Sequence, residues 1–132
     1  MPLRYSTLLV ILACAACRAP TETRLDQQIT FEEIDAPTTI AAPGPLVVNV
    51  RLPHGACHDD IRVLTTAAPG LITLEARAVY SLPRWATACI GIGVLKDTTL
   101  SIPAVTSGAL IVRGLQPDGL VPLDVAVTVT PN

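Results

Sequence analysis

The sequence predicts an all-β domain, an antiparallel β-sandwich of about seven to eight short strands. Three observations support this prediction. Apolar residues alternate with polar ones in several segments, turn-forming residues separate these segments, and proline and glycine recur so often that long helices have little room. The chain of 132 residues has the length of one domain.

The clearest strands are the segments 46–52, 72–80 and 123–129, where apolar side chains occupy every second position. Successive side chains of a strand point to opposite faces, so each segment has one face for the core and one for water. Shorter candidate strands are residues 61–66, 87–94, 98–102 and 109–113, and turn residues lie at 68–70, 96–97, 107–108 and 117–119.

Three further segments precede the first of these strands. Residues 18–28 are polar in their first part and are expected to form a flexible tether. The folded domain is expected to cover residues 29–132, with a strand at 29–34, although residues 21–36 also have room for a helix. Three prolines and a glycine in residues 36–45 predict an irregular connection there.

The first 17 residues have the features of a secretory signal peptide. Arg4 provides a basic start, an apolar run covers residues 8–16, and small residues follow. The apolar run is too short to cross a bilayer, which needs about twenty residues. We therefore expect export of the protein and loss of residues 1–17.

The end of this leader resembles the bacterial lipoprotein signal, in which an apolar residue and two small residues precede a cysteine that is lipidated. Ala15 and Ala16 precede Cys17, while Cys14 stands where the pattern prefers leucine. The resemblance implies lipidation of Cys17 and anchoring of the protein at the bacterial cell envelope, on the periplasmic or outer side of a membrane. The alternative is ordinary signal cleavage after Ala15, which would leave a soluble protein.

The remaining cysteines, Cys57 and Cys89, are an even pair and are expected to form a disulfide in an oxidising compartment. If Ile90, Ile92 and Val94 form a core face, Cys89 points away from the core. The disulfide would then be peripheral and would clamp residues 54–60 over the surface of Gly91 and Gly93, where missing side chains permit close approach.

The number and spacing of the strands resemble an immunoglobulin-like layout. The match does not extend to antibody domains, because Trp85 lies only four residues before Cys89 and Thr87 occupies the position of their tyrosine. The chain is similar over residues 29–131 to the sandwich modules common in bacterial envelope lipoproteins, with no specific family indicated.

A cluster of candidate metal ligands contains His54, Cys57, His58, Asp59 and Asp60. His54, His58 and Asp59 could bind a metal ion if the thiols are oxidised, but their spacing fits no standard zinc pattern. Metal binding in the periplasm is therefore an alternative, and no cofactor is expected.

Catalysis has no support in the sequence. The segment 91–96 has two of the three glycines of a dinucleotide-binding loop, and no serine elbow or paired-histidine helix is present. Nucleic acid is an unlikely partner because the net charge is −2 and no basic patch is present.

Trp85, with Arg84 beside it, is a candidate contact for a partner protein, although a lone tryptophan in a small domain more often packs against the core or the disulfide. The sequence thus predicts an exported, lipid-anchored module with a structural or protein-binding role at the cell envelope. A small secreted inhibitor or enzyme accessory, presenting residues 54–60, is a further alternative.

Overall fold

The computed structural model describes residues 22–132 except for 84–85, 87, 90, 92 and 104. The described residues form nine strands and no helix, which confirms the prediction of an all-β domain. The strands are β1 (Glu22–Gln28), β2 (Glu33–Asp35), β3 (Thr39–Ala41), β4 (Leu46–His54), β5 (His58–Ala68), β6 (Leu71–Pro83), β7 (Val94–Ile102), β8 (Gly108–Leu115) and β9 (Leu123–Thr130).

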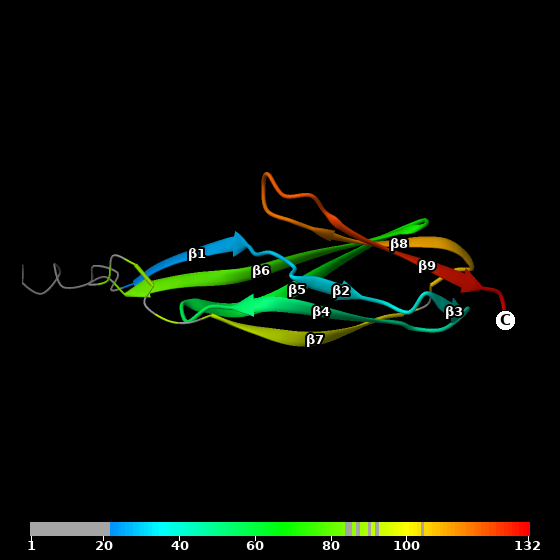
Figure 1. The fold of residues 1–132 in the computed structure, drawn as a ribbon, viewed down its shortest axis with the longest axis horizontal. Coiled ribbons are helices and arrows are strands. Elements are labelled where there is room, and N and C mark those ends of the chain that lie inside the picture. The colour runs from blue at the N-terminus through cyan, green and yellow to red at the C-terminus, as the bar shows by residue number, and fades with distance from the viewer. Residues whose placement is uncertain (1–21, 84–85, 87, 90, 92, 104) are drawn as a thin grey trace, which may run out of the picture.

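Two sheets lie against each other and form a β-sandwich (Figure 1). The smaller sheet has the order β2-β4-β7, and the larger one contains β1, β3, β5, β6, β8 and β9. In the larger sheet β6 pairs with β5 along one edge. Because a strand has only two edges, β8 and β1 share the other one, β8 beside residues 71–75 and β1 beside residues 77–83.

Two of the pairings are parallel, which corrects the expectation of a purely antiparallel sandwich. β6 pairs with β8, and β3 pairs with β9, in the parallel sense. A parallel pair needs a connection that crosses back to the starting end. Between β6 and β8 the chain makes this crossing by running through β7 of the opposite sheet.

The core lies between the two sheets and follows the alternation of the sequence. Leu46, Val48, Val50 and Leu52 of β4 are all buried. The other buried apolar residues are Ile29, Phe31, Ile34, Ile72, Leu74, Ala76, Ala78, Ile102, Val105, Leu110, Val112, Val127 and Val129. In the third segment with clear alternation, 123–129, only Val127 and Val129 belong to the buried core, because the strand begins near the rim of the sandwich.

The N-terminal segments differ most from expectation. We expected a flexible tether over residues 18–28, yet residues 22–28 are strand β1, because the second edge of β6 is open beyond β8 and offers backbone partners. Within the expected irregular segment 36–45, residues 39–41 form β3 beside β9. The strand expected at 29–34 is limited to β2, while the buried Phe31 is held by backbone hydrogen bonds to the Gln116 side chain.

The predicted strand at 87–94 is also corrected. Among its described residues, 88, 89, 91 and 93 have no strand structure, and β7 begins only at Val94. Val94 is 52% exposed, so the expected core face is wrong at this residue; Ile90 and Ile92 lie outside the described residues. The turn predicted at 96–97 is part of β7, because Lys96 and Asp97 continue the pairing with β4.

Other turn predictions are confirmed. β5 and β6 are joined by a tight turn at residues 69–70, in which Gly70 has a φ of 71°. Gly119, between β8 and β9, has a φ of 87°. These left-handed conformations suit glycine because a β-carbon would clash with the backbone of its own residue at such φ angles.

Candidate functional site

The candidate site of the sequence lies at one end of the sandwich, which we call the disulfide end. β4 ends at His54, residues 55–57 form the connection, and β5 begins at His58. The Cys57–Cys89 disulfide, which the sequence predicts, joins this connection to the segment before β7, with a Cα–Cα distance of 5.9 Å. The first residue of β1 and the last residue of β6 lie at the same end (Figure 1).

The connection approaches two glycines closely, as expected. A β-carbon on Gly91 would overlap the Ala56 β-carbon, and one on Gly93 would lie 3.7 Å from the His54 carbonyl oxygen. Cys57 and Cys89 are half-buried and do not belong to the buried core. The disulfide is therefore a peripheral clamp over the glycine surface.

His58 is held by local partners through both ring nitrogens. Its Nδ1 accepts a hydrogen bond from the Gly55 N–H at 3.4 Å, and its Nε2 lies 3.2 Å from the Gln27 side-chain amide of β1. The Gln27 atom that faces Nε2 is its amide nitrogen, so the tautomer of the neutral ring decides which of the two ring nitrogens accepts a hydrogen bond. The ring also packs edge-on against Tyr80, with the centroids 6.0 Å apart.

His54 differs from His58, because its Nε2 is buried and has no hydrogen-bond partner among the residues that the structure describes. Burial lowers the pKa of His54, and the nearby charges of Lys96 and His58 lower it further. The neutral imidazole is therefore favoured around neutral pH. A nitrogen shielded in this way is also poorly placed to receive a ligand from solvent.

The structure does not assemble a metal centre from the candidate ligands. In the part of the chain that the structure describes, no three His, Cys, Asp or Glu side chains are grouped closely enough to hold a metal ion. Asp59 is exposed on β5, and Asp60 forms an ion pair with Arg62. The two sulfurs are bonded to each other and provide no thiolate.

The remaining candidates cannot be placed. Cys17, Arg84 and Trp85 lie outside the described residues. Among the described residues, no helix is long and apolar enough to cross a membrane.

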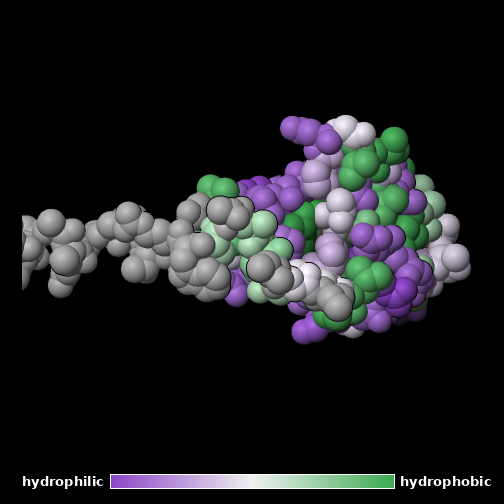
Figure 2. Space-filling view, turned by 60° about the vertical axis from the view of Figure 1, so that its left-hand side comes forward, coloured by the Kyte–Doolittle hydropathy of each residue, from purple (hydrophilic) through white to green (hydrophobic). Residues whose placement is uncertain are grey.

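The start of β7, at the disulfide end, carries two exposed apolar residues that the sequence did not indicate. Val94 is 52% exposed and Leu95 is 55% exposed, and they pair with His54 and Pro53 of β4. The alternating pattern of residues 87–94 predicted Val94 in the core. The structure instead begins β7 at Val94 and exposes both residues to solvent. In the view of Figure 2, hydrophobic residues form small groups between hydrophilic ones.

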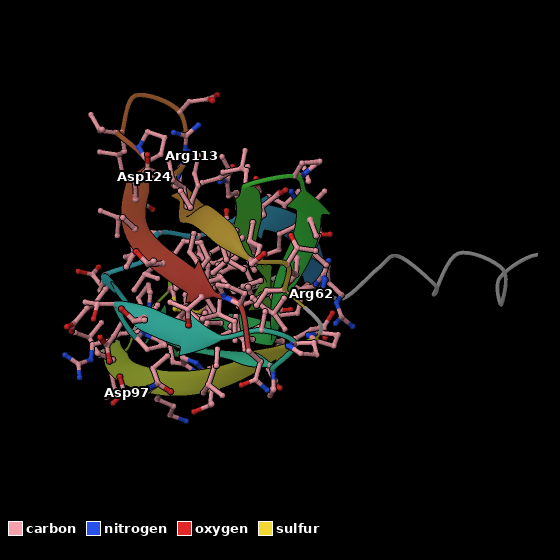
Figure 3. The ribbon with its side chains drawn as sticks, turned by 90° about the vertical axis from the view of Figure 1, so that its right-hand side faces the viewer. Arg62, Asp97, Arg113 and Asp124 are labelled. Atoms are coloured by element: carbon pink, nitrogen blue, oxygen red, sulfur yellow. A yellow bond between two sulfur atoms is a disulfide. The ribbon has the colours of Figure 1, made fainter. Side chains whose placement is uncertain are left out.

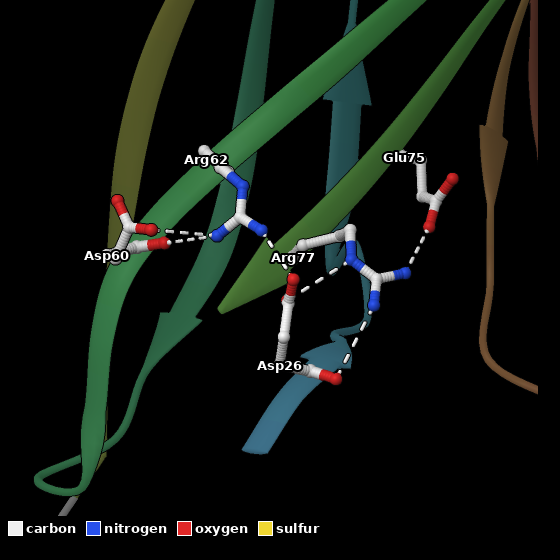
Figure 4. A network of polar contacts seen from close by, with 5 residues as sticks. All are labelled: Asp26, Asp60, Arg62, Glu75 and Arg77. Atoms are coloured by element: carbon white, nitrogen blue, oxygen red, sulfur yellow. Dashed lines mark hydrogen bonds and ion pairs between the residues drawn. The ribbon is translucent and has the colours of Figure 1, made fainter. Parts of the chain in front are cut away.

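A network of ions covers the outer face of the larger sheet next to the disulfide end (Figure 4). Asp26 of β1 accepts hydrogen bonds from Arg62 of β5 at 2.6 Å and from Arg77 of β6 at 3.2 Å. Arg77 also bonds Glu75, and Arg62 bonds Asp60. Partial desolvation raises the pKa of Asp26, but the two arginines outweigh it and hold this pKa below its usual value. The network ties β1 to β5 across β6.

Smaller ion clusters lie elsewhere on the surface. Arg51 of β4 bridges Glu33 and Asp97 on the two flanking strands of the smaller sheet. Arg113 and Asp124 form a pair with two hydrogen bonds of 2.7 and 2.8 Å between β8 and β9. Figure 3 shows Asp97, Arg113 and Asp124 on the outer surface of the sandwich. Hydrogen bonding to the arginines lowers the pKa of Asp97 and Asp124, which favours the ionised carboxylates beside Arg51 and Arg113.

A groove opens between the two sheets at the opposite end of the sandwich, which we call the groove end. Its volume is about 390 Å³. It is lined mainly by small and apolar residues from the β5–β6 turn, the end of β7 and the start of β8: Ala67, Ala68, Pro69, Gly70, Ile72, Ile102, Pro103, Val105, Thr106, Ser107, Ala109 and Leu110. The sequence indicated the turns at 68–70 and 107–108 but not that they face each other across a groove.

Comparison with known proteins gives no relative, since no family model, curated protein or solved structure matches the chain.

Proposed function

We propose that the protein is an exported, lipid-anchored β-sandwich module with an immunoglobulin-like layout and a structural or protein-binding role at the bacterial cell envelope. The observation that carries the proposal is the Cys57–Cys89 disulfide in a chain that begins with a signal-like leader. Disulfides persist in oxidising compartments outside the cytosol. With these two cysteines bonded, Cys17 is left as the candidate for lipidation once the leader has gone.

The surface chemistry favours a protein-binding or structural role over a catalytic one. Each arginine of the ion clusters is paired with one or two carboxylates, and the two histidines at the disulfide end are hydrogen-bonded or shielded. The groove is lined mainly by small and apolar residues, and it suits an apolar side chain of a protein partner.

Labelling of cells with radioactive palmitate tests the anchor. We expect label in the parent protein and in Cys14→Ala, because Cys14 leaves with the leader, and no label in Cys17→Ala. An unlabelled parent protein would contradict the anchor. Label retained in Cys17→Ala and lost in Cys14→Ala would move it to the other cysteine.

Photo-crosslinking in the native organism tests the binding role. A photoreactive amino acid at Ser107, on the rim of the groove, should capture a small set of envelope proteins, whereas one at the exposed Thr99 on the outer face of β7 serves as a control. The same products from both positions would argue against the groove as the binding surface.

A further inference from the structure

The folded body begins immediately after the expected anchor. β1 pairs with β6 over its whole length, from Glu22 opposite Pro83 to Gln28 opposite Arg77. The first residue of β1 is therefore fixed at the disulfide end, and the ion network of Asp26 with Arg62 and Arg77 holds the strand in place. Residues 22–28 of the expected tether are therefore strand, and only four residues of the sequence, 18–21, separate them from Cys17.

This short connection limits how far the domain can stand from its anchor. Five residue steps separate Cys17 from Glu22, and a fully extended chain covers at most about 18 Å over that number. The sandwich is much longer, because the 13 residues of β6 alone extend about 40 Å. The two ends of the body are therefore held at different distances from a lipidated Cys17.

We propose that the short connection orients the sandwich on the bilayer, with the disulfide end facing the lipid surface and the groove end facing away from it. This inference rests on the proposed lipid anchor at Cys17. The groove would then face the aqueous compartment, where a protein partner can bind it. Residues 54–58 and the disulfide would lie near the lipid headgroups.

The chemistry of the disulfide end is compatible with this position. Val94 and Leu95 offer a small exposed apolar surface at the start of β7, and the exposed Lys96 follows them. An apolar pair beside a cation suits the interfacial layer of a membrane. At the start of β5, Asp60 forms an ion pair with Arg62, and the neighbouring Asp59 is an exposed carboxylate.

Energy transfer to the membrane tests the orientation. The mature protein, lipidated in its host at Cys17 and purified, is reconstituted into phosphatidylcholine vesicles that contain headgroup-labelled acceptor lipid. A donor dye is attached through an azide-bearing amino acid at Lys96, near the disulfide end, or at Ser107, at the groove end. We expect several-fold more efficient transfer from position 96.

A second variant tests whether the short connection is the cause. Insertion of 20 Gly and Ser residues between residues 21 and 22 gives a tether with an average reach of about 25 Å, which frees the body to rotate. The difference between the two donor positions should then shrink. An unchanged difference in this variant would overturn the orienting role of the connection.

The outcomes separate the orientation from the anchor. If the vesicle-bound protein gives equal transfer from both positions, or more from Ser107, the orientation is overturned and the anchor remains. If the parent protein carries no lipid and does not bind the vesicles, as expected for Cys17→Ala, both the orientation and the proposed function fail.

Discussion

The two ends of the sandwich are closed to different degrees. The disulfide end is closed by a covalent bond, by close contacts at two glycines and by the hydrogen bond from Gly55 to His58. At the groove end a recess of about 390 Å³ lies between the two sheets. The same two sheets extend to both ends. The comparison shows that a short module can close one end by cross-linking while the other stays open. The open end is the one with space for a partner.

Removing the disulfide should have the largest effect. Closing a loop of 32 residues stabilises a fold by about 3.7 kcal/mol in the chain-entropy model, so Cys57→Ala with Cys89→Ala should lower the free energy of unfolding by roughly that amount. Urea denaturation of the mature protein measures this. A loss below about 1 kcal/mol would mean that the packing of the disulfide end holds it closed without the bond.

Two leucine truncations compare the packing of the two ends. Leu52→Ala, near the disulfide end, should cost about 3–4 kcal/mol, because this side chain is only 1% exposed and leaves a sealed cavity. Leu110→Ala, on the groove wall, should cost about 2 kcal/mol, because its site already borders an open recess. Equal losses in urea denaturation would show that the groove is closed in solution.

A single added methyl group tests the close contact at the disulfide end. Gly91→Ala forces a β-carbon onto that of Ala56, and such overpacking should cost about 1–3 kcal/mol. Combining it with Ala56→Gly should recover most of the loss, and Ala56→Gly alone is the matched control. Failure of this rescue in thermal unfolding would argue that the two residues do not touch.

The smallest effect concerns pH. The pKa of His54 lies below its ordinary value of 6.5 in the folded protein, so the unfolded chain takes up a proton at a higher pH than the folded one. The free energy of unfolding should therefore fall as the pH drops from about 7.5 to about 5.5. His54→Gln should show a weaker dependence over this range. The same slope in both proteins would assign it to another group.

Much of the fold could be predicted because alternation is local. Burial alternates along β4 from Leu46 to Leu52 and along β6 from Ile72 to Ala78, so burying one face of each stretch determines which residues form the core, as Val48 and Leu74 illustrate. The disulfide could also be predicted, because two cysteines remain after the leader and an oxidising compartment favours a bond between them. The clamp over Gly91 followed from the absence of side chains there.

The misses arise where a long-range partner decides the outcome. Residues 22–28 carry little apolar alternation and become a strand only because β6 has an open edge beyond β8. Val94 fits a core pattern but meets solvent, because the pairing of β7 with β4 places it beside His54 at the rim. No local signal distinguishes these cases.

The sequence by itself determined an all-β chain with a cross-linked pair of cysteines and the inward face of its central strands, since side-chain alternation and turn residues act between near neighbours. Only the tertiary structure decided that β6 and β8 run parallel, that the start of β1 lies beside the disulfide, and that a groove opens at the far end. These features depend on which distant strand edges and turns come together in space, and such long-range contacts produce no periodic pattern in the sequence.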